Sequence, residues 1–313
     1  MILKNNPLRF GGISPTQVWN IAHRGARAFA PENTLYAFEK AAAFGCPMFE
    51  MDVHLSKDGE LIVHHDDLLI RCTDVTKKFP RRHSYYLSDF TYEQLRTLDA
   101  GSWYVKEISL PAIDRQQFLQ TLTDQEIQQY VSPRDREIYA SGQVRLPTLR
   151  ETLEFASRTA IMVNIEIKML PRMYSGLTKR VVEMVVEMGL ANHVIISSFD
   201  HEQLLEVRRL SKIIPTGVLT SDRLTKVGEY LRLLDADAYH PGCYGDYDSV
   251  GFNSVNGVLD TRSIQCARAA ERGVNVWTCN DKDEIRRLIA AGVTGLITDF
   301  PNRVREVLAQ CVG

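Results

Sequence analysis

Acidic residues occupy alternate positions in two runs of the sequence that otherwise have the composition of buried β-strands. Glu50 and Asp52 alternate with apolar residues in the run 48–55, and Glu166 does the same in the run 160–168. Because side chains of a strand alternate between two faces, the apolar residues can pack on one face while the acidic residues share the other. Two carboxylates about 7 Å apart along a strand can both turn onto one hard cation, which takes oxygen ligands at about 2.0 to 2.6 Å.

A single acidic residue on a strand is more often part of a salt bridge than of a ligand set. Lys168 lies on the same face of its run as Glu166 and offers such a partner. Three acids on neighbouring inward faces are a different case, because their like charges repel strongly unless a cation lies among them. The pattern therefore favours one site for a hard divalent cation over three separate ion pairs.

A histidine and an arginine follow the first apolar run, in the stretch IAHRGA. His23 ends this expected strand, and Gly25 allows the backbone to turn tightly after it. Imidazole can accept or donate a proton near neutral pH, and the planar guanidinium of Arg24 can bind phosphate oxygens through its fork of donors. On this motif alone, a capping histidine beside a surface arginine is the simpler explanation.

Three further histidines lie in or near the second and third apolar runs. His54 lies close to an expected turn, where we expect it to be solvated, while His64 and His65 occupy opposite faces of the run 60–66. The residues alone leave the choice among these three histidines open.

Two aromatic residues end later strand candidates, Phe199 in SSF and Trp277 in VWT. Aromatic side chains at strand ends usually pack at the rim of a sheet, but they can also bound the pocket of an organic group. The residues alone fit both interpretations.

Nine short apolar runs alternate, for the most part, with longer amphipathic patterns that are typical of helices. The expected strands are 17–23, 48–55, 60–66, 160–168, 193–199, 214–220, 237–242, 274–280 and 295–300. This alternation is typical of β/α units around a parallel sheet. The stretch PENT, Pro31 to Thr34, is expected to open the first helix, with Asn33 or Thr34 as its cap.

One connection differs from the rest, because only the residues SKDG separate the runs 48–55 and 60–66. Parallel neighbours need a crossover of about a dozen residues or more, so these two runs must form a hairpin with Asp58-Gly59 at the turn. Without the second hairpin arm, eight strands alternate with helices, which predicts a (β/α)8 TIM barrel. A doubly wound open sheet is the alternative architecture.

The alternation lapses between about Asp67 and Pro147. A loop of this length without barrel elements is better treated as an inserted subdomain after the second strand. The expected organisation is one barrel domain over residues 18–308, with a hairpin and inserted subdomain over residues 55–146.

The composition is that of an ordinary globular chain: 313 residues, 44% hydrophobic and 24% charged. A net charge of -2 and a pI near 6.5 argue against a broad basic surface for nucleic acid or anionic membranes. The six cysteines form no C-x-x-C pair, so reduced thiols are expected rather than a zinc site or a disulfide framework. Residues 1–17 lack the apolar core of a signal peptide, and no stretch reaches the roughly 20 apolar residues of a membrane helix. We therefore expect a cytoplasmic protein.

Taken together and in order, the motifs HRGA, PENT, E-M-D-V, HHD, NIEIK, SSF, VWT and GLITDFP resemble those of the glycerophosphodiester phosphodiesterase family. The resemblance extends from about Val18 to Leu308, and the number and order of motifs make it far more specific than any one of them. It implies a TIM barrel with an insertion after the second strand. The implied activity is the metal-dependent hydrolysis of glycerophosphodiesters to an alcohol and sn-glycerol 3-phosphate.

Carried over residue by residue, the resemblance implies that Glu50, Asp52 and Glu166 hold one divalent cation, Mg²⁺ or Ca²⁺. It implies that His23 and His65 form the acid/base pair, without deciding which is the acid. His65 is selected because the family's histidine immediately precedes an aspartate. The implied substrate contacts are Arg24 and Lys168 to the phosphate, and Phe199 and Trp277 to the glycerol moiety.

The chain departs from compact members of the family in the length of its insertion, particularly over residues 104–143. This departure leaves the preferred alcohol group and the formation of homo-oligomers open. Two chemical alternatives keep the same site: a lysophospholipase D acting on lysophospholipids, and a lyase that accumulates a cyclic phosphate. A non-catalytic phosphodiester-binding barrel is the alternative of another class. Such a protein is expected to have lost some of the carboxylates or histidines, all of which are present here.

Overall fold

The computed structural model describes residues 18–169, 174–222, 224–243 and 261–311. The expectation about a signal peptide concerns residues 1–17 and lies outside this part of the chain. Among the described helices, none is both long enough and apolar enough to cross a membrane. Each of the nine predicted runs overlaps one strand: β1 Trp19–Ala22, β2 Met48–Leu55, β3 Leu61–Val63, β4 Met162–Ile167, β5 Val194–Ser198, β6 Thr216–Thr220, β7 Ala238–Pro241, β8 Gly273–Val276 and β9 Gly295–Thr298.

Eight of these strands form a closed parallel barrel, as predicted. The sheet runs in the order β1-β9-β8-β7-β6-β5-β4-β2-β3, and a further pairing between β1 and β2 closes it. At the closure Ile21 of β1 lies opposite Met48 of β2 on one side and Ile297 of β9 on the other. The open doubly wound sheet is therefore ruled out.

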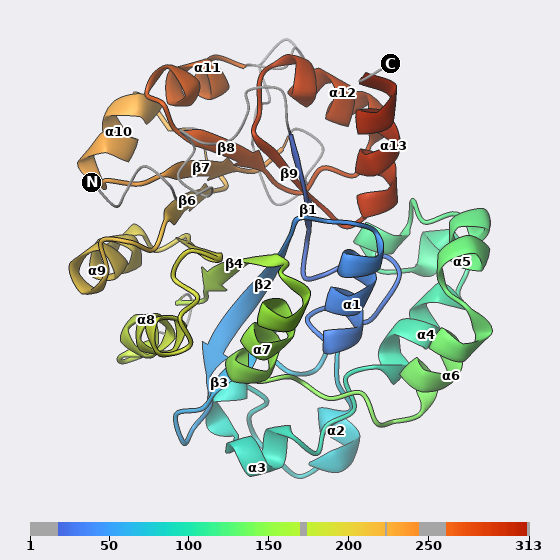
Figure 1. The fold of residues 1–313 in the computed structure, drawn as a ribbon. Coiled ribbons are helices and arrows are strands. Elements are labelled where there is room, and N and C mark those ends of the chain that lie inside the picture. Colours follow the sequence, from blue (N-terminus) through green and yellow to red (C-terminus); the bar gives the residue numbers. More distant parts are fainter. Residues whose placement is uncertain (1–17, 170–173, 223, 244–260, 312–313) are drawn as a thin grey trace.

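Helices surround the barrel (Figure 1). They are α1 Leu35–Ala43, α7 Leu149–Thr159, α8 Leu177–Glu187, α9 His201–Leu210, α10 Val227–Leu233, α11 Arg262–Ala269, α12 Lys282–Ala290 and α13 Pro301–Cys311. Their apolar faces pack on the outward side chains of the strands, such as Phe49, Met51 and Val53 of β2. Thr34 caps α1 by accepting a hydrogen bond from the backbone N–H of Ala37. Of the two caps predicted, Asn33 and Thr34, the structure has the second.

The third strand is the second arm of a hairpin. Val53 pairs with Val63 and Leu55 with Leu61 in antiparallel register. Gly59 in the connecting turn has a φ of +88°, a backbone conformation that favours glycine. The prediction of the hairpin, and with it the count of eight barrel strands, is confirmed.

The inside of the barrel is apolar at one end and polar at the other. Ile21, Met48, Ile195, Ala238 and Ile297 point inward and form a buried cluster at the amino-terminal end of the strands. On four of these five strands, the inward positions further along carry histidine or acidic residues, and on β5 the next inward position is Ser197. The polar end is therefore the carboxyl-terminal end of the strands, where TIM barrels carry their active sites.

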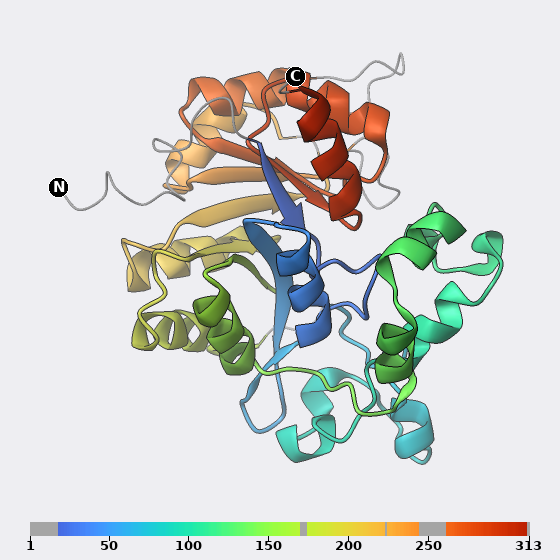
Figure 2. The ribbon, with the colours of Figure 1, turned by 45° about the vertical axis from the view of Figure 1, so that its right-hand side comes forward.

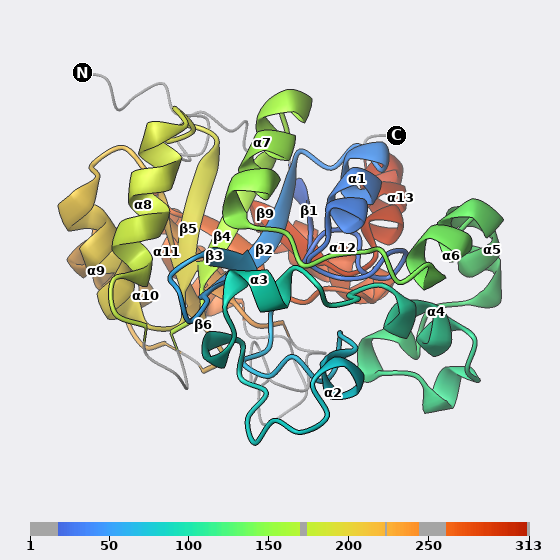
Figure 3. The ribbon, with the colours of Figure 1, turned by 90° about the horizontal axis from the view of Figure 1, so that it is seen from below.

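The segment between β3 and α7 is built from short elements: α2 Val75–Lys78, η1 Leu87–Asp89, α3 Tyr92–Leu95, α4 Ser102–Ile108, η2 Ala112–Asp114, η3 Gln117–Leu119, α5 Asp124–Tyr130 and α6 Pro133–Ala140. Its first part has a small core of its own around Leu87, Phe90 and Leu95. Its second part shares the core of the barrel, for example through the phenol of Tyr104, which donates to the Ala28 carbonyl at 2.7 Å. Figures 2 and 3 show α4, α5 and α6 together at one side of the barrel and α3 beside the hairpin.

Candidate active site

Three carboxylates meet at the polar end of the barrel. Glu50 and Asp52 lie on β2, and Glu166 lies directly opposite Asp52 on the neighbouring strand β4. One ligand atom from each residue lies within 4.8 Å of the other two, and all three side chains are buried. The structure thus brings together the three acids that the sequence pattern groups.

The charges of this cluster are incompletely compensated by the protein. Oε1 of Glu50 and Oδ1 of Asp52 are buried and have no hydrogen-bond partner among the described residues. Burial, together with repulsion from Asp52 and Glu166, raises the pKa of Glu50 well above its usual range. Orphaned carboxylate oxygens converging on one point are the donor set that a hard divalent cation requires. The three residues therefore fit such an ion.

Two basic side chains lie against the carboxylates. Nζ of Lys168 donates to Glu166 at 2.7 Å and lies 3.6 Å from Asp52. The backbone N–H of Arg24 donates to Glu50 at 2.9 Å, and its guanidinium lies 3.6 Å from Asp52. Burial alone lowers the pKa of Lys168, but Glu166 and Asp52 outweigh it and raise that pKa. Both side chains remain cationic and line the same cavity, where an anionic group can meet them.

His23 lies between a structural carboxylate and the acid cluster. Its Nδ1 is 2.7 Å from Oδ1 of Asp299, which follows β9. Its Nε2 is 3.9 Å from Oε2 of Glu50. Burial, then the charges of Arg27 and Arg24, lowers the pKa of His23 to about 4, although Asp299 opposes the shift. The imidazole is thus oriented with Nε2 toward the carboxylates.

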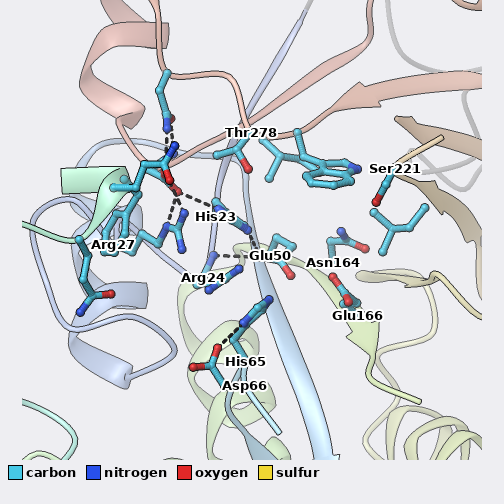
Figure 4. Close-up of a pocket in the computed structure, with 18 of the residues that line it drawn as sticks. His23, Arg24, Arg27, Glu50, His65, Asp66, Asn164, Glu166, Ser221 and Thr278 are labelled. Atoms are coloured by element: carbon cyan, nitrogen blue, oxygen red, sulfur yellow. Dashed lines mark hydrogen bonds and ion pairs between the residues drawn. The ribbon is translucent and has the colours of Figure 1, made fainter. Parts of the chain in front are cut away.

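His65 has the same local arrangement on the other side of the site. Its Nδ1 is 2.7 Å from Oδ1 of Asp66. Burial, then the charges of Arg24 and Lys168, lowers the pKa of His65 well below its usual range. Figure 4 shows the imidazoles of His23, which follows β1, and His65, which follows β3, approaching the region around Arg24 and Glu50.

The expectation that His54 is solvated is wrong. Its side chain is fully buried, and burial lowers its pKa to about 3. Nε2 of His54 donates to the backbone carbonyl of His65 at 3.0 Å, and Nδ1 lies 2.9 Å from the Tyr174 hydroxyl. The hairpin turns so soon after β2 that its second arm covers His54, which then supports the backbone of His65.

Glu32 joins the two histidine–aspartate pairs through arginines. Its carboxylate accepts hydrogen bonds from Arg24 at 3.0 Å and from Arg71 at 2.6 and 3.0 Å, and it lies 3.5 Å from Arg27. Arg27 in turn bonds to Asp299 through both carboxylate oxygens. Arg71 donates to both oxygens of Asp66 at 2.7 and 2.9 Å. The two aspartates that hold the histidines thus belong to one network of alternating charges, which is buried at Asp299 and Glu32 and partly exposed at Asp66 and Arg71.

The stretch PENT has a larger role than opening a helix. Thr34 is the cap of α1, but Glu32 is the centre of the arginine network just described. Asn33 has a φ of +55°, and its amide donates to Oδ2 of Asp52 at 2.8 Å. This strained residue therefore orients a carboxylate of the acid cluster.

A cavity of about 790 Å³ opens over these residues. Phe199 and Trp277 line it, and their rings meet edge to face with centroids 5.5 Å apart. The insertion contributes one wall, formed by Gln116, Gln117, Phe118, Gln120 and Thr121. All nine predicted site residues belong to one site: eight of them line this cavity, and the ninth, Asp52, lies beneath it in the acid cluster.

Several side chains of the site are not indicated by the sequence pattern. Asp299 lies near the end of the predicted run 295–300, directly after the observed strand β9, so the strand-end argument used for His23 could have found it. Asn164 shares the inward face of Glu166, but a neutral amide gives no charge signal. Arg71 and the wall contributed by the insertion lie in irregular segments, where no periodicity indicates which side chains turn toward the barrel.

The barrel and its site define a class, that of TIM barrels with a buried carboxylate cluster and two histidines at the carboxyl ends of the strands. Residues 23–303 match the model of the glycerophosphoryl diester phosphodiesterase family, and the chain belongs to that family.

Three related proteins match this chain over nearly their whole length. The chain is 30% identical over 288 residues to a glycerophosphodiester phosphodiesterase of Bacillus altitudinis, covering 91% of this chain and 96% of that protein. A phosphodiesterase of Oleispira antarctica, solved in complex with the product sn-glycerol-3-phosphate, superposes with a TM-score of 0.67 at 26% identity, covering 94% and 96% of the two chains. A glycerophosphodiester phosphodiesterase from Parabacteroides distasonis has the same fold, with a TM-score of 0.65 at 20% identity over 95% and 100%.

Proposed function

We propose that this protein hydrolyses glycerophosphodiesters to an alcohol and sn-glycerol 3-phosphate, with one divalent cation held by Glu50, Asp52 and Glu166. The observation that carries the proposal is the position of the buried acid cluster between two histidines, each held at Nδ1 by an aspartate. Family membership and the product complex of the Oleispira antarctica relative support it.

The cation is expected to be Mg²⁺ or Ca²⁺, because the donors are carboxylate oxygens alone. When bound, it supplies charge neutralisation and polarisation of the phosphate oxygens. Arg24 and Lys168 already hold positive charge at the same place, so they can bind the remaining phosphate oxygens. Phe199 and Trp277 are proposed to bound the glycerol moiety.

The two histidines can serve opposite ends of an in-line displacement. Because the aspartates fix Nδ1 as the donor, Nε2 of each imidazole is left for proton transfer with substrate. One histidine accepts a proton from the nucleophile, and the other protonates the departing alkoxide. The nucleophile is either water or the vicinal hydroxyl of the glycerol moiety, in which case a transient cyclic phosphate forms. The negative phosphodiester favours the imidazolium form that the acid requires.

An assay of glycerol 3-phosphate release from glycerophosphocholine tests the proposal. Turnover with Mg²⁺ or Ca²⁺ is expected to stop on addition of EDTA and to return when excess metal is added. H23A and H65A should each lose most of the activity, and full turnover in either variant would contradict the acid/base assignment. Metal affinity that survives the double substitution E50A and D52A would contradict the metal site.

The wall contributed by the insertion bears on the lysophospholipid alternative. Four of its five side chains are polar: Gln116, Gln117, Gln120 and Thr121. An acyl chain packed against these polar side chains would bury them without hydrogen bonds, which costs free energy. The wall therefore favours a small polar alcohol. A substrate panel of glycerophosphocholine, glycerophosphoethanolamine, glycerophosphoglycerol and a lysophospholipid decides between the two. A cytoplasmic location and the formation of homo-oligomers stay predictions, for fractionation and light scattering to test.

A further inference from the structure

Asn164 is a buried amide that faces the cavity without a partner. It lies on β4 two residues before Glu166 and pairs in register with Glu50. Its side chain is part of the cavity lining, and the residue is only 1% exposed. Neither Oδ1 nor Nδ2 has a hydrogen-bond partner among the described residues. Leaving both groups of an amide unsatisfied is costly, so the arrangement indicates that a ligand completes it.

Asn164 lies beside the acid cluster, on the inward face of β4. On one side, in register, lies Glu50 of the acid cluster, and on the other lies Ile195 of β5, the strand that leads to Phe199. Asn164 therefore lies next to the proposed metal ligands and lines the same cavity as Phe199 and Trp277. Figure 4 shows it beside Glu50 and Glu166 at the edge of the cavity.

The amide has one acceptor, Oδ1, and one donor group, Nδ2, and few chemical groups of a ligand can satisfy both. A phosphate oxygen would only accept, and would satisfy Nδ2 alone. A cation would satisfy Oδ1 alone. A hydroxyl group both donates and accepts, so one hydroxyl, or a vicinal pair, matches both atoms of the amide.

We infer that Asn164 recognises the hydroxyl groups of the glycerol moiety and thereby determines specificity for glycerol-containing diesters. This inference rests on the proposed function. A site built to hydrogen-bond a substrate hydroxyl discriminates strongly against the analogue that lacks it, because its own polar groups are then left unpaired. Asn164 thus selects the glycerol moiety, while Arg24, Lys168 and the acid cluster handle the phosphate.

Calorimetric binding of sn-glycerol 3-phosphate and of propyl phosphate, which lacks both hydroxyls, tests the inference in the presence of Ca²⁺. Wild-type protein should bind glycerol 3-phosphate more tightly than propyl phosphate. The substitution N164L, which keeps the shape of the side chain, should reduce this preference by about 10- to 100-fold and leave the affinities for propyl phosphate and Ca²⁺ unchanged. Its melting temperature should stay the same or rise, because an unpaired buried amide is removed.

N275L is the matched control. Asn275 is also buried in the barrel, but its amide is already bonded to His240 at 2.9 Å and to Thr294 at 3.0 Å, and it does not line the cavity. N275L should lower the melting temperature and leave the ratio of the two affinities intact. N164A provides the same comparison should N164L perturb packing.

Three results would overturn the inference. If N164L lost affinity equally for glycerol 3-phosphate and for propyl phosphate, Asn164 would be a contact of the phosphate group. If N164L lost affinity for Ca²⁺, Asn164 would be a metal ligand. An unchanged preference would mean that trapped water satisfies the amide. Wild-type protein that releases no glycerol 3-phosphate from glycerophosphocholine would instead contradict the proposed function itself.

Discussion

At the scale of single residues, the two aspartates that hold the histidines are the most informative positions. Asp299 fixes Nδ1 of His23 and Asp66 fixes Nδ1 of His65. D299N and D66N keep the shape of each side chain but permit the wrong tautomer of the imidazole. We expect kcat to fall by about 10²- to 10⁴-fold in each variant, with a displaced pH profile because the stabilised imidazolium is lost.

The control for this prediction is D283N, at an exposed aspartate of α12 that pairs with Arg286 at 2.7 Å. It removes one negative charge without touching the site, so kcat and the pH profile should not change. Should D299N and D66N retain wild-type kcat and pH profile, the aspartates would be structural only.

The residues of the site that sequence analysis predicts are those with a local signal. Glu50, Asp52 and Glu166 alternate with apolar neighbours, and His23 follows a strand, so their direction can be read from a few adjacent positions. Asp299 acts through a histidine 276 residues away in the chain. A strand-end position can mark Asp299 as a candidate, but its pairing with His23 becomes visible only once the barrel closes and brings β9 beside β1.

At the scale of elements, the tight turn between β1 and α1 sets the positions of His23 and Arg24. Gly25 has a φ of +78°, and a Cβ there would lie 2.6 Å from the backbone and Cβ of Ala37. The substitution G25A therefore combines left-handed strain with a clash against α1. We expect it to lower the free energy of unfolding by about 3 kcal/mol or more, measured by urea denaturation.

The substitution G45A, at the other end of α1, separates the cost of backbone strain from the cost of the clash. The φ of Gly45 is +74°, but nothing lies within 4 Å of a Cβ built there. G45A should cost only the backbone strain of about 1 to 2 kcal/mol and should leave activity intact. Equal losses of stability in G25A and G45A would show that the contact with Ala37 does not matter.

The regular elements are predictable because each one carries its own period and boundary signals. The nine strands and the hairpin follow from apolar runs and from the length of one connection. The insertion does not, because its helices are short and owe their positions to tertiary contacts such as that of Tyr104 with Ala28. Its polar wall in the cavity is therefore a finding of the structure alone.

At the scale of the whole molecule, we propose that residues 18–308 form one domain that carries residues 55–146 as an inserted unit. The second part of this unit is fastened to the last helix of the barrel by Glu126 of α5. Its carboxylate accepts hydrogen bonds from Arg303 at 2.8 and 2.9 Å and from Asn302 at 3.0 Å. Arg303 also donates to the backbone carbonyl of Thr121 at 2.7 Å, and both residues line the cavity. This ion pair thus joins the wall of the cavity to the barrel.

Stability should therefore depend on the charge of Glu126. Burial on its own raises its pKa, but the bonds from Arg303 and Asn302 outweigh this and lower the pKa of Glu126 to about 2 from an ordinary value of 4.5. Because the folded-state pKa is the lower one, the stabilisation is complete above pH 4.5 and is lost as the pH falls toward 2. E126Q should lower the free energy of unfolding by about 1 to 3 kcal/mol at pH 7, and this difference from wild type should shrink between pH 4.5 and pH 2.

The exposed pair of Glu93 with Arg96 in the same insertion serves as the control, since E93Q should change stability by less than about 0.5 kcal/mol at any pH. Because Glu126 holds Arg303 and Arg303 holds the wall, E126Q should also raise KM for glycerophosphocholine while kcat changes little. A loss of stability in E126Q that is the same at pH 7 and pH 3 would argue against the ion pair, since only the ionised carboxylate distinguishes glutamate from glutamine at this position.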